Sequence, residues 1–203
     1  MAFSKNAEDY LYAGTTSGDV CGFHTKTKML IFTLNLCALG ARTICAINPH
    51  ELIVGGGDGN IIKLALNGKD TQVSAKTQFH GAIHGLTSSP DGLQGLVATD
   101  KGYLYRVKNN DFSQMLLCEN HTLPVNSCWF QPGGSEKFIT CCEDGTIRIW
   151  DTNNYAVVAR CTAATDKGAV VSGNYAICAI FTDEIIISGW SDGRIRAYRV
   201  DNS

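Results

Sequence analysis

The chain has 203 residues, of which 44% are hydrophobic and 18% are charged, and its formal net charge is −2. This length fits one large domain or two small ones, and this composition excludes a wholly disordered chain. The 17 Lys and Arg residues form no basic run, so we expect no nucleic-acid partner.

The sequence also argues against a secreted or membrane protein. The N-terminal residues MAFSKNAEDY lack the apolar core of about 7–15 residues that marks a signal peptide. The apolar runs fall far short of the roughly 20 residues that span a bilayer. We therefore expect a soluble, intracellular, cytoplasmic protein with no membrane partner.

Five similar stretches recur along the chain, each built around a glycine. In chain order they read TSGDVCGF, GDGNIIKL, DKGYLYRV, EDGTIRIW and SDGRIRAY, centred on Gly18, Gly59, Gly102, Gly145 and Gly193. The spacings are 41, 43, 43 and 48 residues. Repeats of about 40–45 residues are typical of the blades of a β-propeller.

Each repeat is predicted to contain four strands. An apolar run precedes the glycine and an alternating run follows it, which is the pattern of a β-hairpin. An inner apolar segment lies upstream in the later units (42–47, 82–87, 125–130 and 175–180), and a further strand follows the hairpin in the first four units (29–34, 72–77, 113–118 and 156–161). The fold class is therefore all-β, a partial propeller of about four to five four-stranded blades. The expected units are 1–36, 37–78, 79–119, 120–162 and 163–203.

The inner segments carry small residues at positions that look comparable. These residues are Cys45, Gly85, Cys128 and Cys178. Blades converge on a central channel, so we expect small side chains there, and this gives three of the nine cysteines a packing role. The cysteine count is odd and contains no CxxC pair, so we expect reduced thiols rather than disulfides.

The repeats resemble the WD40 family. The fourth unit, NHTLPVNSCWFQPGGSEKFITCCEDGTIRIWD (120–151), is similar to the family pattern of a His, a Pro/Gly turn, an Asp-Gly pair and a terminal Trp-Asp. The resemblance implies that His121, Thr140, Asp144 and Trp150 form a structural hydrogen-bond network within this blade. The other units depart from the pattern, although His80 is a candidate for the same role in the third unit.

A narrower resemblance covers most of the chain in the same order. YLYAGTTSGDV, YLYRV, TIRIWDTNN and IIISGWSDGRIRAY are similar to the central part of cilia- and flagella-associated WD-repeat proteins. Those proteins have two consecutive propellers and bind inside axonemal doublet microtubules. The resemblance implies a cytoskeletal protein of the cilium or flagellum axoneme, with tubulin and other axonemal proteins as partners, and a chain that straddles two propellers.

The two ends of the repeat array are predicted to be incomplete. The first unit starts near its second strand and lacks an inner strand, and the fifth ends after its third strand. Either the chain closes a small ring in an unusual way, or another chain completes the open blades. We favour the second, because unpaired edges promote aggregation.

Several patterns could carry chemistry, but each has a simpler structural reading. Cys141 or Cys142 with His121 could form a nucleophile and a base, yet neighbouring strand residues point to opposite faces. Cys21, His24 and Cys37 lack the fourth ligand of a zinc site. The glycine-rich stretch 54–60 precedes a strand rather than the helix that a phosphate loop needs. We therefore predict no catalytic, metal-binding or cofactor-binding residues.

Three residues near the C-terminal end are candidates for partner contacts. Trp190 either packs against the next blade or contacts a partner, since tryptophan is enriched in interface hot spots. Arg194 and Arg196 share one face of the following strand and form either a solvated face or a binding surface.

Taken together, these patterns predict a non-enzymatic scaffold that binds other proteins through its loops. The alternatives are a general WD40 adaptor of a ubiquitin-ligase or trafficking complex, and a propeller enzyme with polar groups converging on the channel.

Overall fold

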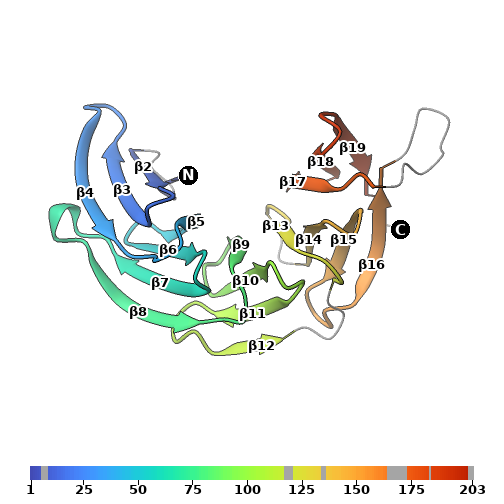
Figure 1. Cartoon of the computed structure of the whole chain (residues 1–203), viewed down its shortest axis with the longest axis horizontal. Helices are drawn as coiled ribbons and strands as arrows, with labels where there is room; N and C mark the ends of the chain where they lie inside the picture. The colour runs from blue at the N-terminus through green and yellow to red at the C-terminus, as the bar shows by residue number, and fades with distance from the viewer. Residues whose placement is uncertain (6–8, 117–120, 134–135, 164–172, 183, 201–203) are drawn as a thin grey trace.

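The computed structural model describes residues 1–5, 9–116, 121–133, 136–163, 173–182 and 184–200. They form five antiparallel β-sheets, which we number in chain order, and each sheet is a meander of consecutive strands. Figure 1 shows the sheets side by side in an open arc, with sheet 1 and sheet 5 at its two ends. The predicted all-β, partial propeller fold is therefore confirmed.

Strands at the same place in successive sheets share one role. The inner strands are β1 (Ala2–Phe3), β5 (Ala41–Asn48), β9 (Ile83–Ser88), β13 (Val125–Phe130) and β17 (Ala176–Phe181). The second strands are β2 (Tyr10–Gly14), β6 (Glu51–Gly56), β10 (Gln94–Thr99), β14 (Lys137–Cys142) and β18 (Ile185–Trp190). The third strands are β3 (Asp19–His24), β7 (Asn60–Ala65), β11 (Leu104–Lys108), β15 (Thr146–Asp151) and β19 (Ile195–Arg199). The outer strands are β4 (Met29–Asn35), β8 (Gln72–Gln78), β12 (Gln114–Leu116) and β16 (Val157–Thr162).

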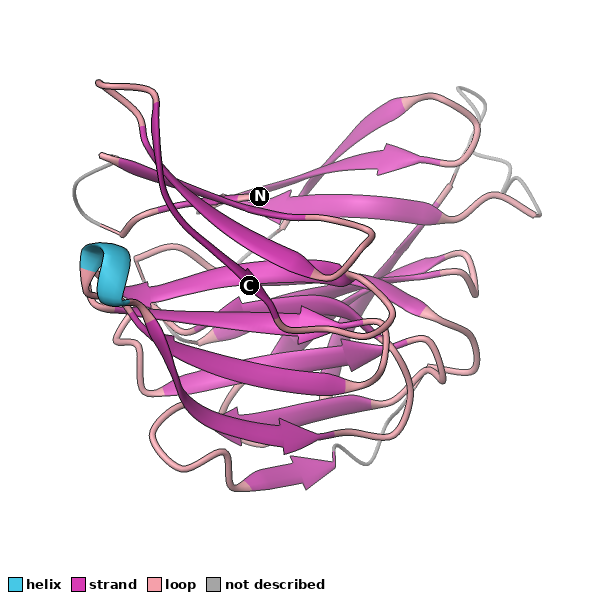
Figure 2. Ribbon diagram, turned by 60° about the vertical axis from the view of Figure 1, so that its left-hand side comes forward, coloured by secondary structure: helices cyan, strands magenta, loops and turns pink. Residues whose placement is uncertain are grey.

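Little helix accompanies these strands. The described residues contain one helical turn, the 3-10 element η1 (Gly68–Asp70), which lies in the connection between β7 and β8 (Figure 2). Among the described residues, no helix is long and apolar enough to cross a membrane.

The turn between the second and third strands needs its glycine. Gly18 has φ +92°, and a Cβ at this position would overlap the carbonyl oxygen of Cys37. Only glycine adopts this backbone conformation without steric cost. The glycines that define the sequence repeat thus mark the same tight turn in each sheet. The stretch 54–60 contains the end of β6, the turn and the first residue of β7 rather than a phosphate loop.

Sheet 1 corrects one expectation. It contains a short inner strand, in which Ala2 pairs with Tyr12 and Phe3 pairs with Leu11. The prediction that the first unit lacks an inner strand is therefore wrong. Two residues are too few to show strand periodicity, so the sequence pattern did not reveal it.

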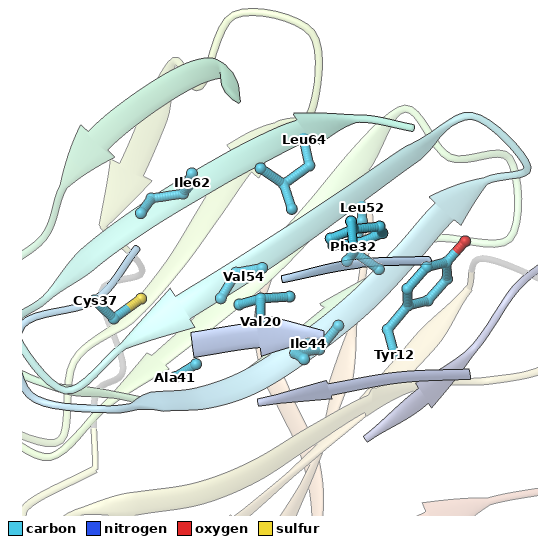
Figure 3. Close-up of a cluster of buried hydrophobic side chains, with 10 residues drawn as sticks. All are labelled: Tyr12, Val20, Phe32, Cys37, Ala41, Ile44, Leu52, Val54, Ile62 and Leu64. Carbon is cyan, nitrogen blue, oxygen red and sulfur yellow. The ribbon is translucent and has the colours of Figure 1, made fainter. Parts of the chain in front are cut away.

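The hydrophobic core is divided into four clusters, one between each pair of neighbouring sheets. Sheets 1 and 2 bury Tyr12, Val20 and Phe32 against Leu52 and Leu64, as Figure 3 shows. The other three clusters follow the same plan between sheets 2 and 3, 3 and 4, and 4 and 5. Each sheet is thus held by the faces of its neighbours, which is why an end sheet leaves one face open.

The small inner residues do not occupy one structural position. The register pairs Gly85 with Ala98 and Cys178 with Gly189, which are matching sites. Cys128 pairs with Thr140, one residue further along its strand, and Cys45 pairs with Ile53, one further still. The expectation that Cys45, Gly85, Cys128 and Cys178 are equivalent is therefore wrong.

Candidate functional site

The fourth sheet brings four polar side chains into one hydrogen-bonded chain. His121 Nδ1 lies 2.8 Å from Asp144 Oδ2, and His121 Nε2 lies 2.7 Å from Thr140 Oγ1. Trp150 donates its indole N–H to the same Thr140 oxygen at 2.9 Å. Because Thr140 accepts from Trp150, its own hydroxyl proton can go to His121 Nε2, and His121 Nδ1–H then donates to Asp144. The chain of bonds joins the β14–β15 turn to the segment that precedes β13.

Burial and hydrogen bonding set the charge states of His121 and Asp144. Burial lowers the pKa of His121, against the opposing influence of Asp144, so the imidazole is neutral. Burial alone would raise the pKa of Asp144, but hydrogen bonds from His121 and Thr146 outweigh it and hold that pKa well below its usual range. Arg148 also donates to Asp144 Oδ2 at 3.1 Å. A neutral histidine between a carboxylate and a hydroxyl suits a fixed structural role.

The neighbouring cysteines are buried, and their thiols have raised pKa values. Cys141 is 1% exposed and Cys142 is fully buried. Burial raises the pKa of the Cys142 thiol to about 12 and that of Cys141 well above its ordinary value. A nucleophilic cysteine needs a lowered pKa, so neither thiol has the environment of a catalytic residue.

One group of side chains has the spacing to hold a metal ion. The ligand atoms of His121, Cys142 and Asp144 all lie within 4.8 Å of one another. Each is already used, since Cys142 Sγ donates to the Leu123 carbonyl at 3.2 Å and accepts from the Asp144 N–H at 3.3 Å. An ion would have to replace these bonds and deprotonate a buried thiol, so the donors fit the hydrogen-bonded state better.

The other cysteine and histidine residues considered as metal ligands do not form a site. Among the described residues, Cys21, His24 and Cys37 form no cluster of metal ligands. Cys37 is buried, and burial raises the pKa of its thiol to about 11. The Tyr10 ring packs edge-on against His24.

In sheets 2 and 3, an aspartate near the turn glycine is hydrogen-bonded to a backbone N–H group instead of a histidine side chain. Asp58 accepts the N–H of Ala38 at 3.1 Å, and Asp100 accepts the N–H of Ala82 at 2.9 Å. His80 is exposed and lies against the Tyr103 ring. The suggestion that His80 takes the histidine role in the third unit is therefore wrong.

The three C-terminal candidates are not alike. Trp190 is 2% exposed and packs in the cluster between sheets 4 and 5, and its indole N–H donates to Ser188 Oγ at 2.7 Å. It therefore offers no surface to a partner and packs instead against the preceding blade. Arg196 lies over the Trp190 ring and pairs with Asp192 at 2.7 Å, while Arg194 is exposed.

A feature that the sequence analysis missed is a β-bulge repeated in four inner strands. In each strand the second residue has no Cα partner on the neighbouring strand, and the register shifts at that point. These bulged residues are Arg42, His84, Asn126 and Ile177. Bulges re-aim side chains, and here they direct one residue of each sheet to the same cavity.

The bulged side chains connect the sheets around the channel. Arg42 Nη1 donates to His84 Nε2 at 2.8 Å, and the His84 ring also interacts with the Asn126 side chain. Asn126 Nδ2 then donates to the Ala176 carbonyl at 3.2 Å. Burial and the Arg42 charge lower the pKa of His84, against weaker opposing effects of Asp100, Asn126 and Glu143. A neutral His84 can accept from Arg42 at Nε2 while it keeps a proton on Nδ1.

These residues line a cavity of about 790 Å³, which we call the channel-mouth cavity. Its walls come from all five sheets and their connections, including Thr15 beside sheet 1 and Tyr175 beside sheet 5. Glu143 also lines it, opposite in charge to Arg42. Aligning the observed inner strands by their first residue places Arg42, His84, Asn126 and Ile177 in one column, but the segments recognised in the sequence begin at other residues and do not show it.

Sheet 5 leaves an apolar face uncovered. Ile180, Ile187 and Ile195 are 46%, 38% and 79% exposed. The positions of sheet 4 that match Ile187 and Ile195 are Ile139 and Ile147, which are 1% and 0% exposed because sheet 5 covers them. We call the face of sheet 5 that carries Ile180, Ile187 and Ile195 the open isoleucine face.

The chain is similar to known WD-repeat proteins. Residues 112–151 match the WD40 family, described as WD domain, G-beta repeat. Cilia- and flagella-associated protein 52 of Bos taurus is 31% identical over 196 residues, 95% of this chain and 30% of the relative. The protein of the same name from Chlamydomonas reinhardtii is 28% identical over 199 residues, 94% of this chain and 30% of the relative. WD repeat-containing protein 90 of Mus musculus is 23% identical over 211 residues, 97% of this chain and 11% of the relative.

The similarity extends along nearly the whole chain, whereas the chain spans about 30% of the length of cilia- and flagella-associated protein 52. The match at residues 112–151 ends at the Trp150-Asp151 pair and covers most of sheet 4. Residues 112–151 thus match the WD40 repeat within an array of five similar sheets, and nearly the whole chain is similar to cilia- and flagella-associated protein 52.

Proposed function

We propose that the chain is a non-enzymatic scaffold of the cilium or flagellum axoneme. The observation that carries this proposal is the similarity over 95% of the chain to a protein named for its association with cilia and flagella. In this proposal the protein binds the inner side of doublet microtubules, with tubulin and other axonemal proteins as its neighbours. The green-algal relative supports a role that does not depend on animal tissue.

The environment of the polar groups supports a binding role rather than catalysis. The histidine of sheet 4 is held neutral between Asp144 and Thr140, and the thiols beside it have raised pKa values. A rigid stack of sheets instead presents loops and open faces, which is how propellers bind proteins.

The open isoleucine face supports a partner chain that completes the array. Inside the chain, the equivalent face of sheet 4 is covered by the small and aromatic residues Ala176, Ala179 and Phe181. We propose that a β-blade of another chain covers the face of sheet 5 in the same way. Clustered exposed apolar side chains of this kind are typical of protein interfaces.

Co-sedimentation with isolated axonemal doublet microtubules tests the function. The purified chain should pellet with doublets, and Ile187→Asp should reduce the bound fraction while the exposed Lys108→Gln variant should not. If the wild-type chain stays in the supernatant together with both variants, the axonemal proposal fails. If all three pellet equally, the axonemal proposal stands and the role of the open isoleucine face fails.

A further inference from the structure

The channel-mouth cavity has a charged and an apolar part. Arg42, His84 and Asn126 form its polar lining and are linked by hydrogen bonds. Leu39 and Ile177 also line it and are 64% and 51% exposed. Sites of about 300–1,000 Å³ that combine apolar walls with a few convergent polar groups are typical of binding sites.

From this arrangement we infer that the channel-mouth cavity binds an extended segment of a partner protein that carries a single acidic side chain, with Arg42 as its receptor. The inference rests on the proposed function as a protein-binding scaffold, and it adds the face of the molecule and the chemistry of the segment.

The Arg42 guanidinium is held in position and keeps N–H donors that can bind a carboxylate. A guanidinium has five N–H donors in a planar fork that matches a carboxylate. Among the described residues, the Arg42 side chain donates to His84 through one nitrogen, Nη1. This bond fixes the guanidinium while leaving further donors for a ligand, and an arginine already held in place loses less conformational freedom on binding.

His84 supports Arg42 without competing for the carboxylate. Its pKa is lowered by burial and by the Arg42 charge, so the ring is neutral and accepts from Arg42. The ring is in turn oriented by Asn126, which is tied to sheet 5 through the Ala176 carbonyl. The position of the arginine is therefore set by groups from three neighbouring sheets.

Glu143 limits which acidic segments fit. It lines the same cavity and its charge acts on His84. A run of acidic residues would bring like charges next to this carboxylate, which is destabilising. An isolated acidic residue flanked by apolar residues can instead pair with Arg42 and contact Leu39 and Ile177, which line the same cavity. The cavity thus selects a mixed apolar and acidic segment over a polyacidic tail.

Peptide titration on the full chain, monitored by NMR of labelled histidine rings, tests the inference. The probes are capped Leu-Glu-Leu and Leu-Gln-Leu tripeptides and a capped tri-glutamate peptide. We expect Leu-Glu-Leu to shift the His84 ring signals and to bind at least about tenfold more tightly than either of the other peptides, because a charge-assisted bond to arginine is lost with Gln. Arg42→Gln should abolish the preference for Glu over Gln, while Lys108→Gln should keep it.

The outcomes separate this inference from the proposed function. Equal binding of the Glu and Gln peptides, or a Glu preference that survives Arg42→Gln in a variant with wild-type circular dichroism, overturns the site. Preferred binding of the tri-glutamate peptide overturns the selection assigned to Glu143. A site that passes this test in a chain that fails to pellet with doublets leaves the site standing and removes the axonemal function.

Discussion

Ile147 and Ile195 occupy the same position in successive blades, two residues after the glycine of the β-turn, yet Ile147 is fully buried and Ile195 is 79% exposed. The difference comes from the neighbouring sheet. Sheet 5 covers the face of β15, whereas the described chain places no sheet against the corresponding face of β19. The exposed fraction of the residue two positions after the turn glycine therefore shows whether a neighbouring sheet covers that face of the blade.

This pair gives the first prediction. Ile147→Asp buries a charge between sheets 4 and 5 and should destabilise the chain by more than about 4 kcal/mol or prevent folding. Ile195→Asp should change the free energy of unfolding by no more than about 0.5 kcal/mol, since the side chain is already in water. Urea unfolding followed by circular dichroism measures both. Similar losses for the two variants would contradict the assignment of a covered and an open face.

The second prediction concerns the hydrogen-bond chain of sheet 4. Thr140→Val keeps the side-chain shape but removes the oxygen that links His121 to Trp150. It should cost about 1–3 kcal/mol, because two buried polar groups lose their partner. Thr33→Val, on the exposed strand β4, should be close to neutral. If the two valine variants unfold at the same urea concentration, the chain of bonds does not stabilise the blade.

The third prediction follows from the lowered pKa of His121. Because its folded-state pKa lies below the ordinary 6.5, the unfolded state binds more protons below that pH, and stability falls as the pH drops from about 7 to 5. The lowered pKa of Asp144 adds a contribution that is full above 3.8 and is lost as the pH falls further.

His121→Gln is the variant that isolates this effect. It should reduce the loss of stability between about pH 7 and 5, although the lowered pKa of His84 leaves a part of it. Urea midpoints at several pH values measure the dependence for both proteins. A pH dependence that is unchanged in the variant would show that His121 is not the titrating group.

The fourth prediction concerns thiol reactivity. Cys178 is exposed, whereas Cys128, Cys141 and Cys142 are buried with raised pKa values. Iodoacetamide should therefore alkylate Cys178 in the folded chain long before the other three, and peptide mass spectrometry identifies the labelled sites. Cys118 lies outside the described residues and is not part of this comparison. Rapid labelling of Cys142 would contradict its assignment as a packing residue.

The repeat could be predicted from the sequence because two local features mark it. A glycine at the turn, an apolar run before it and an alternating run after it are readable without knowing the neighbouring blades, and β14 and β15 lie at the apolar run Phe138–Cys141 and the alternating run Ile147–Trp150. The hydrogen-bond network of sheet 4 came instead from the resemblance of the fourth repeat to the WD40 pattern, which implied the roles of His121, Thr140, Asp144 and Trp150.

The errors came from register and from side-chain direction. The bulge falls at the same point of four inner strands, but the segments recognised in the sequence begin at different points relative to it, so residues counted along them do not align, as with Cys45 and Gly85. The polar lining of the channel-mouth cavity was missed because the bulged residues differ in type and meet only in space. Trp190 was expected to pack against the next blade or to contact a partner, because the alternation alone does not say which face of sheet 5 is covered; it packs against the preceding blade.

The most direct test of the account is a cryo-EM map of the native assembly that contains this protein. The account predicts a β-blade of another chain packed against Ile180, Ile187 and Ile195, with the protein lying inside a doublet microtubule. A map in which this face of sheet 5 is exposed to solvent, or in which the protein lies away from the axoneme, would contradict it.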